Sequence, residues 1–161
     1  RAMTWDEVDL TDGVWTVPAE RMKANAAHRV PLSARAIEIL EGQKEMAGHP
    51  DLVFPSQGGS VPSDMILTKF LRDQKIASSE KGRIAVAHGF RASFRDWASE
   101  NGYSRDYAER ALAHTISNQT EAAYHRTDLL DQRRGMMNAW AQFVCGMGAT
   151  DDNIVPLKER A

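Results

Sequence analysis

The segment His88-Gly89-Phe90-Arg91 places an imidazole and a guanidinium three residues apart. On a helix this spacing puts the two side chains on one face, because residues three or four apart are neighbours there. Near a helix N-terminus the free backbone amides and the macrodipole favour an anion, and the guanidinium fork matches two phosphate oxygens. The pair therefore indicates phosphate binding, although a His and an Arg on a solvated helix face often have no function.

Two further residues of reactive type follow. His114 stands after Leu112-Ala113 at the expected end of a helix, and Tyr124 lies ten residues later in the run Ala122-Ala123-Tyr124-His125-Arg126. A tyrosine hydroxyl attacks phosphorus only when its proton is removed or its anion is stabilised, since its pKa is ordinarily about 10. Groups that bind a phosphate beside such a tyrosine would supply that stabilisation.

The order of these groups resembles that of the tyrosine recombinases, the family of phage and integrative-element integrases. The matching features are Lys23 in a polar loop, the pair His88 and Arg91, the run Leu112-Ala113-His114, Tyr124, and the opening run Thr4-Trp5-Asp6-Glu7-Val8-Asp9-Leu10. The four motifs that follow one another from Lys23 to Tyr124 are together far more specific than any one of them, and the resemblance covers roughly residues 3 to 145. The sequence of residues 17–23 and 28–33 is similar to that of integrases of prophages and genomic islands.

The resemblance implies a role for each residue. Tyr124 would attack the scissile phosphate of double-stranded DNA, forming a 3′-phosphotyrosine and a free 5′-hydroxyl, which keeps the bond energy available for religation. Arg91 would hold the non-bridging oxygens, His88 would assist proton transfer or orient the phosphate, and His114 would donate a hydrogen bond to a non-bridging oxygen. Lys23 would protonate the departing 5′-oxygen, a task that suits a flexible ammonium on a loop.

The same resemblance implies site-specific recombination or integration at DNA attachment sites by a homotetramer. Protein side chains would stabilise all of the charge that develops on the phosphate during the reaction, so neither a cofactor nor a metal is expected. Two other functions stay open. A type IB topoisomerase uses the same tyrosine chemistry to relax supercoils, and a degenerate domain could bind DNA without cutting it. A covalent protein-DNA adduct would separate binding alone from cleavage.

Each residue assignment also has a simpler alternative. Tyr124 could be an ordinary half-buried helix tyrosine, and His114 could only cap a helix C-terminus, where an imidazolium is favoured anyway. Lys23 has the most competitors, because exposed loops are rich in lysine and Arg21 and Arg29 stand near it in the sequence.

One feature of the family is missing from the sequence. The family carries a further catalytic arginine on a helix that precedes the Trp-Asp-Glu-Val-Asp segment by more than two turns. Arg1 stands only four residues before Trp5 and is too close to fill this position. The expectation is a catalytic domain over residues 1–146 that lacks its N-terminal helix or helices, followed by a tail over 147–161. A DNA-clamping domain is expected upstream, and the fragment alone is expected to be impaired.

Three short strands are predicted before the first helix. Val8–Leu10 and Val14–Val17 flank Asp12-Gly13, and Asp-Gly between alternating apolar residues is typical of a hairpin turn. A third strand around His28–Leu32 follows the polar loop that carries Lys23. The expected fold is mainly α with a small antiparallel three-stranded sheet (α+β), as in the tyrosine recombinase catalytic domain.

Helices are predicted over the rest of the chain. Their expected ends are Ser33, Pro62-Ser63, His88, Asn101-Gly102, Ser104 and Thr127. Two apolar stripes are expected to be buried: Ile66, Leu67, Phe70 and Leu71 in one helix, and Phe90, Phe94, Trp97 and Ala98 in the next. The second stripe would turn His88 and Arg91 away from the core.

Composition sets wider limits. The 161 residues are 42% hydrophobic, which is enough to bury one core. The net charge of −2 is unusual for a DNA-binding domain, but basic residues gather within 21–44 and 69–83, so a basic face can coexist with an acidic back. No apolar run of about 18 residues and no signal-peptide layout is found, so no membrane association is expected, and the single Cys145 cannot form an internal disulfide. These features predict a cytoplasmic protein.

Overall fold

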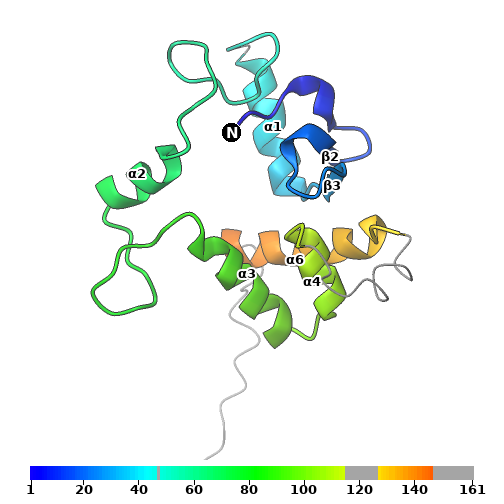
Figure 1. Ribbon diagram of the computed structural model, residues 1–161, viewed down its shortest axis with the longest axis vertical. Helices are drawn as coiled ribbons and strands as arrows, with labels where there is room; N and C mark the ends of the chain where they lie inside the picture. Colours follow the sequence, from blue (N-terminus) through cyan, green and yellow to red (C-terminus); the bar gives the residue numbers. More distant parts are fainter. Residues whose placement is uncertain (47, 115–126, 147–161) are drawn as a thin grey trace, which may run out of the picture.

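The computed structural model describes residues 1–46, 48–114 and 127–146. Within them lie η1 (Trp5–Glu7), β1 (Val8–Asp9), β2 (Val14–Val17), η2 (Ala19–Arg21), β3 (His28–Pro31), α1 (Ala34–Glu45), α2 (Ile66–Asp73), α3 (Gly89–Glu100), α4 (Arg105–Ala111) and α6 (Leu130–Cys145). The sheet and α1 form one layer, and α3, α4 and α6 form a second layer beside it (Figure 1). The prediction of a mainly α fold with a small three-stranded antiparallel sheet is confirmed.

The sheet forms where the sequence alternates and turns. Its strand order is β1-β2-β3, with both pairs antiparallel. The turn between β1 and β2 needs Gly13, whose φ of +61° is a conformation that a residue with a Cβ rarely adopts. The amide of Asp12 donates to Oδ1 of Asp9 at 2.8 Å in the same turn. The β2–β3 register pairs Val17 with His28, so the loop between these strands begins and ends at the same end of the sheet.

Each layer has its own apolar core. Beneath the sheet and α1 the buried side chains are Met3, Leu32, Leu40 and Val53. Between α3, α4 and α6 they are Phe94, Trp97, Ala98, Ala108, Leu112 and Met136. Trp140 of α6 packs edge-on against Phe94 with 5.4 Å between ring centroids, and Tyr103 stacks on Trp97 at 5.3 Å. The second core therefore fixes α3 against α4, the two helices that carry candidate site residues.

A buried arginine joins the two layers. Arg133 of α6 is fully buried, and its Nη2 donates to the carbonyl of Arg29 in β3 at 2.9 Å, while its Nε donates to the carbonyl of Asp128 at 2.8 Å. The next residue, Arg134, donates to the carbonyl of Gly13 at 3.3 Å. Burial lowers the pKa of the Arg133 guanidinium, an effect that the Asp128 carboxylate opposes. Two adjacent residues of α6 thus hold the sheet.

Three predicted helix ends are confirmed. The Ser33 hydroxyl accepts the amide of Ala36 at 3.3 Å, and the Ser104 hydroxyl accepts the amide of Asp106 at 3.2 Å. The third end is at Gly102, which follows α3 with a left-handed φ of +74°. These ends depend only on residues within one turn, which is why the sequence predicts them.

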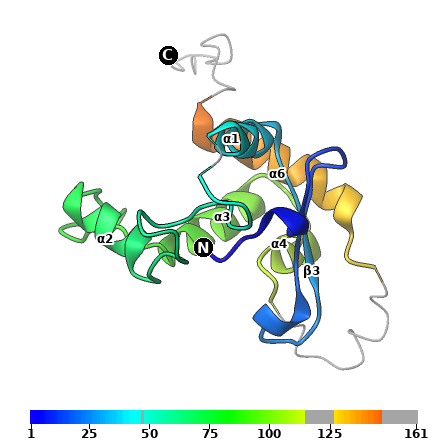
Figure 2. The ribbon, with the colours of Figure 1, turned by 90° about the horizontal axis from the view of Figure 1, so that it is seen from above.

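The burial predicted for α2 is wrong. The helix begins at Ile66, three residues after Ser63, and of its four expected core residues only Leu71 is buried. The relative exposures of Ile66, Leu67 and Phe70 are 48%, 62% and 58%. In both ribbon views α2 stands away from the two layers, so no other described element covers its apolar side (Figures 1 and 2). Apolar periodicity predicts a helix, but burial requires a neighbouring element.

Two further expectations are corrected. Phe90 is 54% exposed, because it lies on the first turn of α3 and lines an open groove with Ile76 and Ile84. Thr127 does not cap α6 directly. Its hydroxyl accepts the amide of Leu129 at 3.2 Å, and Leu129, with a left-handed φ of +54°, is the residue that precedes the helix. The predicted tail, residues 147–161, lies outside the described residues.

Replacing Arg133 with methionine should lower the free energy of unfolding by about 2 to 4 kcal/mol, because two backbone carbonyls would lose their donor. The measurement is urea denaturation followed by circular dichroism. Arg29→Gln is the control, since it removes an ion pair with Asp128 that is half exposed and stabilises by less than about 1 kcal/mol. Equal losses in the two variants would show that Arg133 does not join the layers.

Candidate functional site

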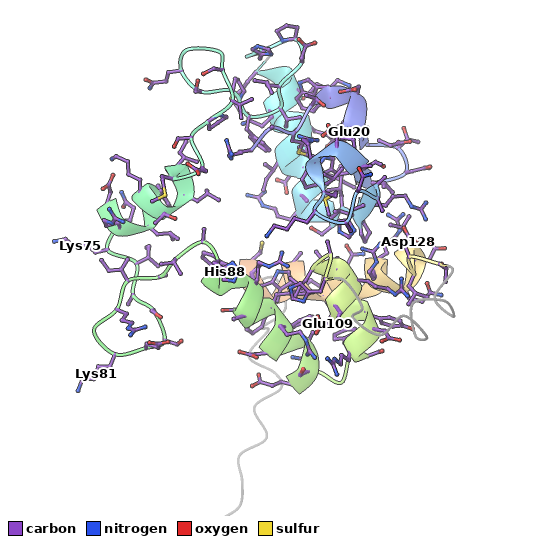
Figure 3. All side chains as sticks on the ribbon, in the orientation of Figure 1. Glu20, Lys75, Lys81, His88, Glu109 and Asp128 are labelled. Carbon is purple, nitrogen blue, oxygen red and sulfur yellow. The ribbon has the colours of Figure 1, made fainter. Side chains whose placement is uncertain are left out.

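His88 and Arg91 lie at the start of α3 in different surroundings. His88 precedes the first turn and is exposed (Figure 3). Arg91 is half-buried, and its Nη2 donates to the carbonyl of Leu112 at 2.5 Å. The expectation that both side chains point away from the core is therefore right for His88 and wrong for Arg91, because α4 ends beside this face of α3. Nε and Nη1 of Arg91 have no hydrogen-bond partner among the described residues, so they can still bind phosphate oxygens.

His114 is placed by the way α4 ends. Leu112 closes the helix, and Ala113 then adopts a left-handed backbone with a φ of +52°. The amide of Ala113 donates to the carbonyl of Arg110 at 3.0 Å, and the amide of His114 donates to the carbonyl of Glu109 at 2.9 Å. This pair of bonds is a Schellman turn, which satisfies the last carbonyls of the helix. His114 therefore occupies a fixed position directly after the turn.

The carboxylate of Glu109 on α4, which is labelled in Figure 3, contacts two arginines and one histidine. Nε of Arg95 donates to Oε1 at 2.7 Å, Nδ1 of His114 pairs with Oε2, and Nε of Arg105 lies 4.0 Å from Oε1. The hydrogen bond from Arg95 lowers the pKa of Glu109, and His114 lowers it further although burial opposes the shift. Nothing in the sequence marks Glu109 as special except its position five residues before His114.

The loop between β2 and β3 brings Lys23 to the same region. The loop residues on either side of Lys23, Met22 and Ala24, line a cavity of about 170 Å³ whose wall also includes Ala113 and His114. The side chain of Lys23 is exposed and has no partner in the part of the chain that the structure describes. Its ammonium is thus unpaired among the described residues, on a loop that lines this cavity through its neighbours.

Arg21 and Arg29, which compete with Lys23 by sequence, are both engaged elsewhere. Arg21 pairs with the carboxylate of Glu7, and Arg29 donates to both oxygens of Asp128 at 2.8 Å. Burial opposes a low pKa at Glu7, but hydrogen bonds that include the one from Arg21 lower it overall. These pairings leave Lys23 as the loop cation that is available for another partner.

The wall of this cavity carries positive charge. Nε and Nη2 of Arg110 and Nη1 of Arg133 are buried without a hydrogen-bond partner among the described residues. His28 also lines the cavity, where burial and the charge of Arg133 lower its pKa against an opposing hydrogen bond with the Ala111 backbone. Among the described residues that line the cavity, Asp128 is the acidic one. The positive charges of Arg110 and Arg133 beside this space favour an anion.

The structure brings Arg91, His114 and the loop of Lys23 together, with His88 less than one turn from Arg91. Tyr124 lies within residues 115–126, outside the described residues. Across residues 1–46, 48–114 and 127–146 there is no group of three or more His, Cys, Asp or Glu side chains that could hold a metal ion. None of the described helices is long and apolar enough to cross a membrane.

Comparisons with known proteins agree with these motifs. A family model described as "Phage integrase family" matches residues 1–129. The chain is 37% identical over 140 residues to prophage integrase IntA of Escherichia coli (strain K12), and 33% identical over 160 residues to the integrase of Enterobacteria phage P4. These matches cover 87% and 89% of the chain but only 33% and 36% of the relatives, so the chain spans about a third of their length. No solved structure matches.

Ala113→Gly should leave the free energy of unfolding unchanged or raise it by up to about 1 kcal/mol, because glycine adopts a positive φ without steric cost. Ala111→Gly, two residues earlier inside α4, should lower it by about 1 kcal/mol. Urea denaturation of both variants is the measurement. A loss in Ala113→Gly as large as that in Ala111→Gly would mean that the left-handed turn is absent.

The free energy of unfolding should also fall as the pH drops below about 6.5. Burial and Arg133 lower the pKa of His28 in the folded chain, whereas the unfolded chain binds the proton at its ordinary value of about 6.5. The contribution of neutral His28 is therefore complete above that value and is lost as the pH falls toward the lowered pKa. Urea denaturation at about pH 7.5 and pH 5.5 should show a smaller loss in His28→Gln than in the wild type. Identical losses would contradict this.

Proposed function

The chain belongs to the phage integrase family, and from this premise we propose that the complete protein cuts and rejoins double-stranded DNA at specific attachment sites. Tyr124 would be the nucleophile, and a 3′-phosphotyrosine would be the intermediate. The names of the relatives, prophage integrase and integrase, support integration as the purpose of the reaction over the relaxation of supercoils. Four copies would assemble on two DNA sites in the cytoplasm.

The observation that carries the proposal is the convergence of three separate segments at one turn. Arg91 comes from α3, His114 follows α4, and Lys23 belongs to the β2–β3 loop. All three are cationic or proton-donating groups. Arg91 donates to the carbonyl that precedes Ala113, His114 follows Ala113 directly, and the loop residues on either side of Lys23 line a cavity with Ala113. Groups of one charge repel one another, so their convergence favours a site that binds an anion.

In the proposed reaction the phenol oxygen of Tyr124 attacks phosphorus, and the bond between phosphorus and the 5′-oxygen breaks. Arg91 and His114 would neutralise the charge that develops on the non-bridging oxygens, where preorganised donors have their largest effect. Lys23 would give its proton to the leaving 5′-oxygen, and His88 would accept the phenol proton or orient the phosphate. Attack of a 5′-hydroxyl from another strand on the phosphotyrosine restores the phosphodiester, so the number of phosphoester bonds is unchanged.

DNA binding without efficient cleavage is the second candidate for these 161 residues taken alone. The first catalytic arginine of the family has no counterpart in the sequence, and the Nη1 atom of Arg1 donates to the carbonyl of Pro62 at 3.0 Å, before α2. The loss of one preorganised donor to a developing oxyanion lowers a rate by about 10²- to 10³-fold. We therefore propose that the isolated chain binds DNA but cleaves it slowly.

In the complete protein, Tyr124→Phe should abolish covalent protein-DNA adducts on a nicked suicide substrate. The affinity for duplex DNA should stay within about threefold of the wild type. This affinity comes from contacts between basic side chains and phosphates, to which the tyrosine hydroxyl does not contribute. Adducts are measured on denaturing gels in excess EDTA. The wild type should still react there, because side chains would stabilise the charge of the transition state in place of a metal ion: Arg91, His88, His114 and Lys23.

Tyr107→Phe is the matched control, because this half-buried tyrosine of α4 packs against the core and should be dispensable for adduct formation. Adducts that persist in Tyr124→Phe would disprove the nucleophile assignment. Strict magnesium dependence of cleavage by the wild type would disprove the proposal that side chains alone stabilise the charge of the transition state.

A further inference from the structure

We propose that Glu109 is a positioning residue for His114, whose carboxylate keeps a proton on Nδ1 of the imidazole and leaves Nε2 for the DNA phosphate. Glu109 would not touch the DNA. The role of Nε2 rests on the proposed function, whereas the way in which the ring is held does not.

Two contacts from one residue hold His114. Its amide donates to the carbonyl of Glu109 at 2.9 Å, and its Nδ1 pairs with Oε2 of the same residue. The Schellman turn at Ala113 makes this possible, because it returns the chain to the residue five positions earlier. An ionised carboxylate only accepts hydrogen bonds, so Nδ1 must be the donor. The tautomer of the neutral ring is therefore set by Glu109.

Arg95 holds Glu109 in place. Its Nε donates to Oε1 at 2.7 Å, and its guanidinium also contacts the hydroxyl of Ser99 on the same helix. Each oxygen of Glu109 thus has its own partner, and both side chains of the Arg95–Glu109 pair are mostly buried, with exposures of 27% and 23%. Arg105 adds little, since it is 82% exposed and lies at 4.0 Å.

The same face of α3 makes both contacts with the end of α4. Arg91 donates to the carbonyl of Leu112, and Arg95, one turn later, donates to Glu109. The group that would bind the phosphate and the group that would orient His114 are therefore parts of one helix. This shared support keeps the distance between Arg91 and His114 fixed while DNA enters the site.

The tautomer has a chemical consequence. With its Nδ1 proton committed to Glu109, His114 can donate from Nε2 to a non-bridging oxygen only as the imidazolium. When the ring carries both protons, the carboxylate of Glu109 faces it and compensates its charge. Without Glu109 the ring could rotate and take the other tautomer. Removal of comparable orienting partners from histidines in metal sites lowers activity by about 10- to 100-fold.

The first test measures the ring itself in the 161-residue chain. Long-range ¹H–¹⁵N spectra distinguish the two neutral tautomers of His114 at alkaline pH. The wild type should show the proton on Nδ1, Glu109→Ala should show it mainly on Nε2, and Glu109→Gln should show a mixture because an amide can either accept from Nδ1 or donate to it. Arg105→Gln is the control and should match the wild type.

The second test measures cleavage in the complete protein. Glu109→Ala should lower the single-turnover rate of adduct formation by about 10- to 100-fold, with the Kd for duplex DNA unchanged within about threefold. Arg105→Gln should keep the wild-type rate. A residue that only supports the fold would change affinity and rate together, so the separation of the two identifies a positioning role.

The outcomes separate this inference from the proposed function. If His114 carries its proton on Nδ1 in all of the variants, Glu109 does not set the tautomer and the inference is wrong, whatever Tyr124 does. If the tautomer changes but the rate does not, the catalytic part of the inference is wrong. If the wild type forms no adduct at all, the proposed function fails, while the spectra still decide how the ring is held. Glu109→Gln keeps the size of the side chain and gives the spectral answer if Glu109→Ala does not fold.

Discussion

The arrangement of the site depends on the hydrogen bond between Arg91 and the carbonyl of Leu112. The last carbonyls of a helix have no partner within the helix, so α4 can end in a packed region only if donors come from a turn or from another element. The left-handed Ala113 supplies the turn and α3 supplies the second donor. The contact that ends α4 therefore also sets the position of His114 relative to Arg91.

Carboxylates are placed among the arginines of this fold and compensate their charge. Glu7, Glu109 and Asp128 each pair with an arginine, and the pKa of each is lowered even though burial opposes the shift. Each carboxylate fixes its arginine in one orientation. Across the described residues, the side chains of Lys23 and His88 stay exposed and without such a partner. Lys23 and His88 are therefore unpaired among these residues, whereas Arg91 and His114 each make one contact within the fold and keep other nitrogens for a ligand.

Local rules made the fold predictable, and the lack of tertiary information limited the prediction of the site. The glycine turn at Gly13 and the cap at Ser104 depend on neighbours within one turn, so the sequence is sufficient for them. The exposure of Phe70 and Phe90 depends on whether another element lies beside them, which apolar periodicity does not contain. Glu109 looks like a solvated helix residue in the sequence, and its two hydrogen-bonded partners come from the packing of α3, which brings Arg95, and from the turn at Ala113, which brings His114. Tyr124 stays a prediction from the family motif.

A net charge of −2 and the proposed DNA-binding site are compatible for the same reason. Net charge counts a paired carboxylate and a free ammonium equally, whereas a phosphate at the cavity is influenced mainly by charges within about 10 Å, since salt screens the rest. Around the cavity, Asp128 is already held by Arg29, and the unpaired donors belong to Arg110 and Arg133. Two arginines and one aspartate thus line the cavity, although the chain as a whole is acidic. The salt dependence of the proposed DNA binding should therefore reflect the number of phosphates contacted and not the net charge of the protein.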